Sequence, residues 1–222
     1  MEQETIQKKK PSIFGMIFSP GVQFERIREK PVIWVPLILF TVLMTIVTAI
    51  TALNVDYTAV PGMEMSPEEL EMAKIFGIAG AAVVGFFVTP ITYLFFALIF
   101  WAIAKIAKSD ATFKQMLSFS IFIGFISIIG QILNQLIILV IDGDPTIMLT
   151  SVNSFVGADG ILGAVLSTIE VFTIWYYILL TMGLVIVGKL SKPAATIITI
   201  VFFILGLIFA AVGGAFEGMT QL

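Results

Sequence analysis

The sequence predicts an all-α integral membrane protein, a five-transmembrane-helix bundle with a cytoplasmic N-terminus and a C-terminus outside the cell. Three observations lead to this class. The chain is 59% hydrophobic and only 12% charged, whereas an average globular domain carries about 25% charged residues. It contains five long apolar runs. Its Lys and Arg residues lie almost entirely on one side of these runs, as the positive-inside rule requires of the cytoplasmic side.

Each apolar run is longer than the about 20 residues that a helix needs to cross the hydrocarbon core. The chain therefore divides into a cytoplasmic N-terminal segment, 1–31, and a membrane domain, 32–222. The predicted spans cover residues 32–53, 75–104, 117–141, 161–188 and 194–216. Glu170 is the only charged residue inside a span.

The N-terminal segment carries a short amphipathic helix just before the first span. Ser19 can cap this helix and Pro20 can begin it, and Phe24 and Ile27 share one apolar face. The helix could lie on the membrane surface, or its charges could serve only to fix the topology. The predicted juxtamembrane surface comprises Lys8, Lys9, Lys10, Phe24, Arg26, Ile27, Arg28 and Lys30.

The second span follows a capping box, in which Ser66 precedes Pro67 and Glu69 lies three residues after the cap. This helix is expected to begin before the bilayer and to tilt, or to kink at Pro90. Small residues recur along the first two spans, as in helices that pack closely in lipid.

The third and fourth spans each carry a polar stripe at helical spacing. Because the two helices are antiparallel, Glu170 reaches a depth similar to that of Gln131 and Asn134, which allows a hydrogen bond between them. The stripes are interpreted either as a structural seam, which the single carboxylate favours, or as a route for a proton, cation or polar solute. The predicted seam comprises Gln131, Asn134, Gln135, Glu170, Thr173 and Tyr177.

The composition argues against most enzyme chemistry. The chain has no Cys and no His, which removes thiol and imidazole nucleophiles and the ligands that transition metals prefer. The spans hold no Lys and no second acid for a catalytic dyad, and the sequence has no phosphate-binding loop. No catalytic residue, cofactor or metal site is predicted.

The motif from Phe18 to Pro31, Phe-Ser-Pro-Gly-Val-Gln-Phe-Glu-Arg-Ile-Arg-Glu-Lys-Pro, leads into five spans and resembles the bacterial branch of the YIP (Ypt-interacting protein) domain family. The resemblance extends from about Ser12 to the end of the chain. It implies five spans, the orientation given above and a multi-pass protein of the bacterial cytoplasmic membrane. It also implies a membrane adaptor and not an enzyme.

Two hypotheses of function follow. The first is a non-enzymatic adaptor or accessory protein that organises membrane partners in export or envelope-stress resistance. Its expected partners are membrane lipids and other membrane proteins, with an ABC-type exporter and a homo-oligomer as candidates. No nucleic acid is expected, because the basic cluster is short and lies beside a span. The alternative is a small permease or channel that uses the polar seam around Glu170.

Overall fold

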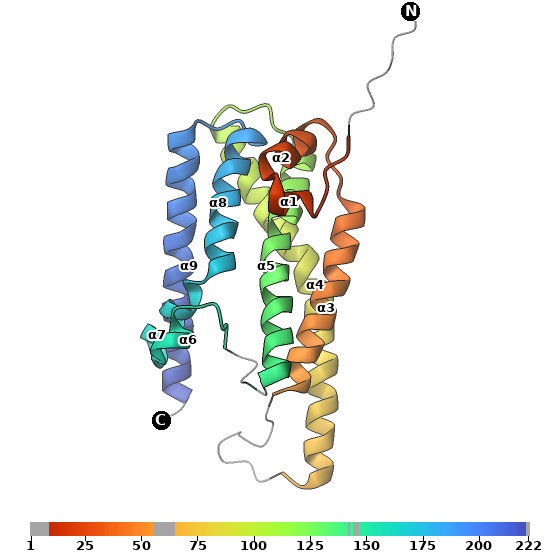
Figure 1. Cartoon of the computed structure of the whole chain (residues 1–222), viewed down its shortest axis with the longest axis vertical. Helices are drawn as coiled ribbons and strands as arrows, with labels where there is room; N and C mark the ends of the chain where they lie inside the picture. The colour runs from red at the N-terminus through yellow and green to blue at the C-terminus, as the bar shows by residue number, and fades with distance from the viewer. Residues whose placement is uncertain (1–8, 56–64, 142, 144–146, 221–222) are drawn as a thin grey trace, which may run out of the picture. The chain divides into compact units, whose positions relative to one another are not determined.

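The structure is a computed structural model that describes residues 9–55, 65–141, 143 and 147–220, and these residues form helices joined by turns and loops (Figure 1). The predicted all-α class is thus confirmed. In chain order the helices are α1 (Gly15–Phe18), α2 (Pro20–Glu29), α3 (Trp34–Leu53), α4 (Pro67–Ile106), α5 (Phe113–Ile141), α6 (Asn153–Val156), α7 (Gly160–Thr168), α8 (Val171–Ile186) and α9 (Lys192–Thr220).

Among the described residues, four helices are long and apolar enough to cross a membrane, namely α3, α4, α5 and α9. The fourth predicted span, 161–188, was expected to be one continuous helix, but the structure divides it into two helices. Helix α7 ends at Thr168, Ile169 leaves the helical region with φ −85° and ψ 89°, and α8 begins at Val171. With 16 residues, α8 is about 24 Å long, which is less than the about 30 Å of the hydrocarbon core.

The predicted capping box before α4 is confirmed. The Ser66 N–H donates to Glu69 Oε2 at 2.8 Å, and the Glu69 N–H donates to Ser66 Oγ at 3.3 Å. The bonds that the Ser66 N–H and the Ser66 hydroxyl donate to the Glu69 carboxylate lower the pKa of Glu69. From this start α4 runs for 40 residues and continues through Pro90. A second capping box, which the sequence analysis missed, joins Thr112 and Gln115 at the start of α5.

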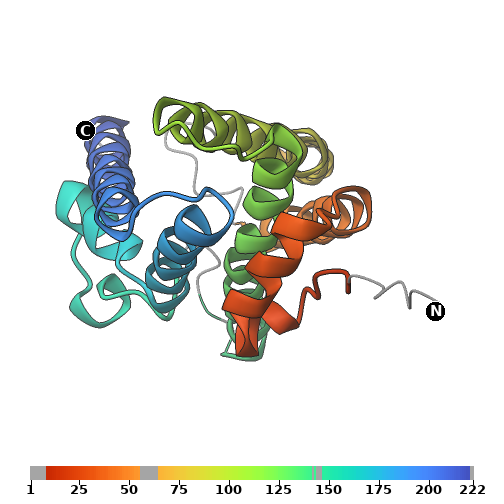
Figure 2. The same cartoon turned by 90° about the horizontal axis from the view of Figure 1, so that it is seen from above.

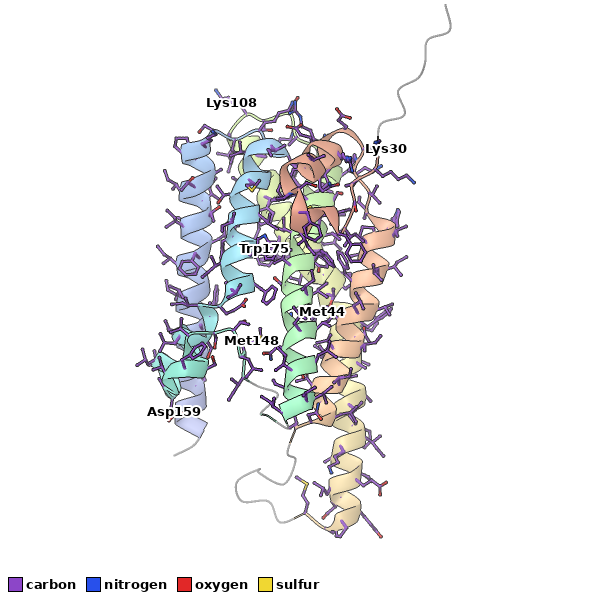
Figure 3. The ribbon with its side chains drawn as sticks, viewed as in Figure 1. Lys30, Met44, Lys108, Met148, Asp159 and Trp175 are labelled. Atoms are coloured by element: carbon purple, nitrogen blue, oxygen red, sulfur yellow. The ribbon has the colours of Figure 1, made fainter. Side chains whose placement is uncertain are left out.

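The chain forms two compact units, and most of the long helices contribute to both. Unit 1 consists of residues 1–37, 92–126 and 175–204, and unit 2 consists of residues 38–91, 127–174 and 205–222. Apart from Lys74, the Lys and Arg residues of the described chain all belong to unit 1. Figure 3 shows two of them, Lys30 and Lys108, at the same end of this unit. We call it the basic end.

The core of unit 1 is built around the first half of α5, where Met116 through Ile126 are buried. The ring of Phe119 lies at its centre, 5.7 Å from the ring of Phe24 and 5.6 Å from that of Phe100 between centroids. Gly183 of α8 faces the same ring so closely that a Cβ atom at this position would overlap it. Seen from above in Figure 2, α2 lies across the start of α5.

In unit 2, α3 and α4 pack through the small residues that the sequence singled out. The Thr48 hydroxyl donates to the backbone oxygen of Ala81 at 3.0 Å. A Cβ atom at Gly85 would lie 2.5 Å from Thr48 Oγ1 and 2.9 Å from the Cα atom of Thr45. The two backbones can approach this closely only because position 85 has no side chain.

Candidate functional site

Glu170 forms the N-terminal cap of α8. Its carboxylate accepts a hydrogen bond from the Phe172 N–H at 2.8 Å and another from the Thr173 N–H. The first N–H groups of a helix have no partner within the helix, and in a buried place each needs an acceptor. Glu170 is only 7% exposed. The buried Glu170 carboxylate therefore caps the start of α8 in unit 2.

A segment that we call the strap, residues 147–152, lies against this cap. The Thr150 hydroxyl donates to Glu170 Oε2 at 3.0 Å. Ser151 and Glu170 form an isolated antiparallel bridge, and the Val152 N–H donates to the backbone oxygen of Ile169 at 3.0 Å. Helix α7 can thus end at Thr168 because the strap supplies partners for the non-helical residues that follow it.

The other end of the strap is held by Asn134 of α5. The Asn134 Nδ2 group donates to the Ile147 backbone oxygen at 2.8 Å, and the Leu149 N–H donates to Asn134 Oδ1 at 2.8 Å. Asn134 is buried, and these two bonds give both its amide NH₂ group and its amide oxygen a partner. Figure 3 labels Met148, which lies between the two anchored strap residues.

The structure brings Asn134 and Glu170 together through the strap and not through the direct hydrogen bond that the sequence analysis considered. Gln135 is buried near Asn134 on α5, while Gln131 and Thr173 are half-buried, and all three belong to unit 2. Tyr177 belongs to unit 1, where its hydroxyl donates to the Phe202 backbone oxygen of α9 at 3.2 Å.

Sequence reasoning missed the strap because it lies in a connection between predicted spans. One signal was present. The apolar residues Ile147, Met148 and Leu149 lie in the connection between two predicted spans and are followed directly by Thr150 and Ser151. An apolar stretch of this kind next to hydrogen-bonding side chains is what a buried loop requires.

At the basic end, the amphipathic helix α2 turns its apolar face into the protein. Phe24 and Ile27 are fully buried, which corrects the expectation that this face would rest on the membrane surface. The reason is that Phe24 packs edge-on against Phe119 of α5. Phe18, just before α2, does point outward, and its side chain is 85% exposed.

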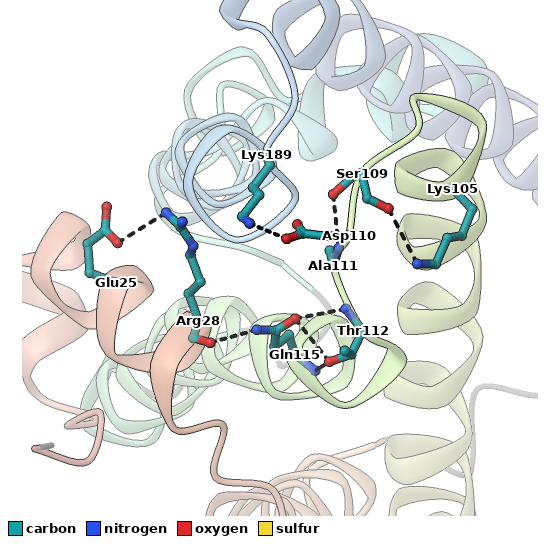
Figure 4. Close-up of polar contacts among 9 residues, drawn as sticks. All are labelled: Glu25, Arg28, Lys105, Ser109, Asp110, Ala111, Thr112, Gln115 and Lys189. Atoms are coloured by element: carbon teal, nitrogen blue, oxygen red, sulfur yellow. Dashed lines mark hydrogen bonds and ion pairs between the residues drawn. The ribbon is translucent and has the colours of Figure 1, made fainter.

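Two side chains of α5 fix α2 in place by donating hydrogen bonds to backbone oxygens at and after the end of α2. Gln115 Nε2 donates to the Arg28 backbone oxygen at 2.6 Å (Figure 4), and the Ser118 hydroxyl donates to the Val32 backbone oxygen at 2.8 Å. The carbonyl groups at and after the end of a helix lack intrahelical partners. The bonds from Gln115 and Ser118 give two of these carbonyl groups a donor and set the path from α2 into α3.

The charged members of the predicted juxtamembrane surface remain near solvent. Lys9, Lys10 and Lys30 are exposed, whereas Lys8 lies outside the described residues. Arg28 is 3.7 Å from the Glu25 carboxylate, and Arg26 donates to the Gln23 side chain at 3.3 Å.

An ion pair joins two connecting segments of unit 1. Lys189, which follows α8, lies 2.5 Å from the carboxylate of Asp110, which precedes α5 (Figure 4). The hydrogen bond from Lys189 lowers the pKa of Asp110 below its usual range. Next to Asp110, the Lys105 ammonium group donates to the Ser109 backbone oxygen at 3.3 Å, and the Ala111 N–H donates to Ser109 Oγ at 3.0 Å.

A set of long apolar helices, a helix broken at a buried carboxylate and a basic end together define a multi-pass integral membrane protein. The Yip1 domain model matches residues 14–213. The chain belongs to the Yip1 domain family, which confirms the resemblance found in the sequence.

The chain is similar to the "Membrane protein YknW" of Bacillus subtilis (strain 168), with 36% identity over 221 residues that cover 96% of this chain and 94% of that protein. No solved structure gives a significant match. The family, the bacterial membrane relative and the apolar helices place the protein in the cell membrane as a multi-pass protein.

Proposed function

We propose that the protein is a non-enzymatic membrane adaptor, an accessory protein that organises other membrane proteins in export or in resistance to envelope stress. The observation that carries this proposal is the use of Glu170. Its carboxylate accepts bonds from two backbone N–H groups and from Thr150. An acid committed to these partners serves the architecture of unit 2, which favours a scaffold over a proton route.

The topology that we propose has five crossings. Helix α7, the break at Ile169 and Glu170, and helix α8 together form the fourth crossing, so that the N-terminus is cytoplasmic and the C-terminus is outside. The charge distribution supports this orientation, because the described Lys and Arg residues other than Lys74 belong to unit 1. Acidic residues at the start of α4, Glu68, Glu69 and Glu71, belong to unit 2.

The orientation in this topology can be tested cleanly because the sequence has no Cys. In whole cells, a membrane-impermeant thiol reagent should label the variant Glu71→Cys and leave Lys114→Cys unlabelled until the membrane is opened. Both positions are exposed, so reagent access depends on the side of the membrane alone. The opposite pattern would reverse the orientation.

The basic end is the surface that we propose for a partner on the cytoplasmic side, with an ABC-type exporter as one candidate. Its shape is fixed by the bonds from Gln115 and Ser118 to the chain leaving α2, and by the ion pair of Lys189 with Asp110. A surface held in one conformation loses less entropy on binding.

Copurification of the tagged full-length chain in mild detergent tests the adaptor function directly. A Lys108→Cys variant with a short thiol-reactive crosslinker should capture a specific membrane protein, whereas the matched Glu71→Cys variant at the other unit should capture it less. The proposal is overturned if no specific partner is recovered across growth conditions and deletion of the gene leaves export and envelope integrity unchanged.

A further inference from the structure

A half-open groove on unit 1 runs between the end of α8 and the start of α9. Its volume is about 360 Å³, within the about 300–1,000 Å³ range of ligand pockets. Over its length most side chains are apolar or carry a hydroxyl, and a lysine stands at one end. The lining residues are Thr181, Met182, Val185, Ile186, Lys192 and Thr196.

We propose that this groove binds an anionic phospholipid, with one acyl chain along Met182, Val185 and Ile186 and the phosphate at Lys192. Lys192 is the first residue of α9, so it stands where the helix meets the headgroup region if α9 crosses the bilayer. The positive end of the α9 dipole lies at the same place. Basic pockets between transmembrane helices are suited to anionic headgroups.

The charges around the groove favour a phosphate at Lys192 in particular. The neighbouring Lys189 is engaged with Asp110. Among the described residues, no carboxylate pairs with Lys192, whose side chain is exposed. The ammonium group at the mouth of the groove therefore has its charge available to a ligand.

The lining favours a lipid chain over a helix from another protein. Helices associate in lipid through small residues that let the backbones approach. Here the wall of the groove presents the long side chains Met182 and Ile186 and the branched Val185. From Lys192 to Thr196 the groove follows α9 for about 6 Å, which suits the upper part of an acyl chain beside its glycerol.

Native mass spectrometry of the full-length protein, released from vesicles of phosphatidylcholine with or without phosphatidylglycerol, tests the headgroup site. The wild type should retain phosphatidylglycerol in preference to phosphatidylcholine. Lys192→Ala should lower its apparent affinity for phosphatidylglycerol at least about ten-fold, the effect of losing one direct hydrogen bond from the ammonium group to the charged phosphate. The matched control Lys114→Ala removes an exposed charge at the start of α5 and should change it little.

The acyl-chain site is tested without any substitution, so that a folding defect cannot obscure the result. Phosphatidylglycerol with a photoreactive group on its acyl chain should crosslink to the wild-type protein chiefly at Met182, Val185 or Ile186. The proposal is overturned if crosslinks are spread evenly over the exposed apolar faces of α3, α4 and α9. Equal losses of affinity in Lys192→Ala and Lys114→Ala would overturn it as well, since they would indicate attraction to surface charge alone.

Discussion

Replacing Glu170 should destabilise the protein to a degree that depends on whether hydrogen bonding is kept. In Glu170→Ala the N–H groups of Phe172 and Thr173 and the hydroxyl of Thr150 all lose their acceptor. A hydrogen bond to a charged group contributes about 1.5–3 kcal/mol, and loss of a cap costs about 0.5–2 kcal/mol. Because these effects overlap at one helix end, we expect a loss of about 3–5 kcal/mol in the free energy of unfolding.

The variant Glu170→Gln should lose only about 1–2 kcal/mol. Its amide oxygen can still accept from one backbone N–H. Its NH₂ group can donate to Thr150, because a hydroxyl is both donor and acceptor. The bond that the amide cannot replace is the second N–H at the start of α8. The difference between the two variants therefore measures the hydrogen bonds that the amide retains.

Reversible unfolding of the purified protein in detergent micelles gives these free energies, and amide hydrogen exchange at Phe172 and Thr173 locates the effect. Exchange at both amides should accelerate in Glu170→Ala. The interpretation of Glu170 as a cap fails if Glu170→Ala unfolds within 0.5 kcal/mol of the wild type, or if Glu170→Gln is equally destabilised. If Glu170→Gln remains folded but abolishes a proton-coupled flux of the reconstituted protein, the permease hypothesis gains support instead.

Three further predictions concern packing, the strap and pH. Gly85→Leu should lower the free energy of unfolding by about 1–3 kcal/mol, because the new side chain forces α3 and α4 apart. The control is Gly80→Leu on the same helix, where a Cβ atom meets nothing within 4 Å. In the same unfolding assay this control should stay near the wild type. Asn134→Ala should lower the free energy of unfolding by about 2–3 kcal/mol, because the Ile147 oxygen and the Leu149 N–H of the strap lose their partner. Faster hydrogen exchange at residues 147–149 would locate this loss, and unchanged exchange would contradict it. Lys189 lowers the pKa of Asp110 in the folded protein. The ion pair therefore stabilises the fold at any pH above the ordinary Asp pKa of about 3.9. This stabilisation is lost as the pH falls through the lower pKa that Asp110 has in the folded protein. The unfolding midpoints of the wild type and Asp110→Asn should therefore converge at low pH, and a constant difference would refute the pairing.

Composition and charge were sufficient to predict the membrane class and the helical fold. Capping boxes are local in sequence, so the pairing of Ser66 with Glu69 could be predicted from the sequence alone. The Thr48 and Gly85 contact was also accessible, because small residues at helical spacing have one obvious use in lipid. These features depend on neighbours along the chain or on one helix face.

The break at Glu170 could not be predicted in the same way. Hydropathy over 161–188 is continuous, and a single acid in such a run is equally compatible with an intact helix. What decides the outcome is the strap, whose partners on α5 and α8 are distant in sequence. The burial of Phe24 is a similar case, since an amphipathic face indicates only that it will be covered. Whether lipid or Phe119 covers it depends on tertiary packing.

The way in which the break is satisfied bears on the choice between scaffold and permease. In lipid every backbone group must find a partner inside the protein. Here the Phe172 and Thr173 N–H groups bond to the Glu170 carboxylate, the Ile174 N–H donates to the Glu170 backbone oxygen at 3.0 Å, and the Ile169 oxygen accepts from the strap. Broken helices that carry solutes leave such groups facing a cavity, where an ion or substrate completes them. In this protein the Glu170 carboxylate and the strap complete them, so the break favours one conformation of unit 2, which supports the proposed scaffold over a solute route.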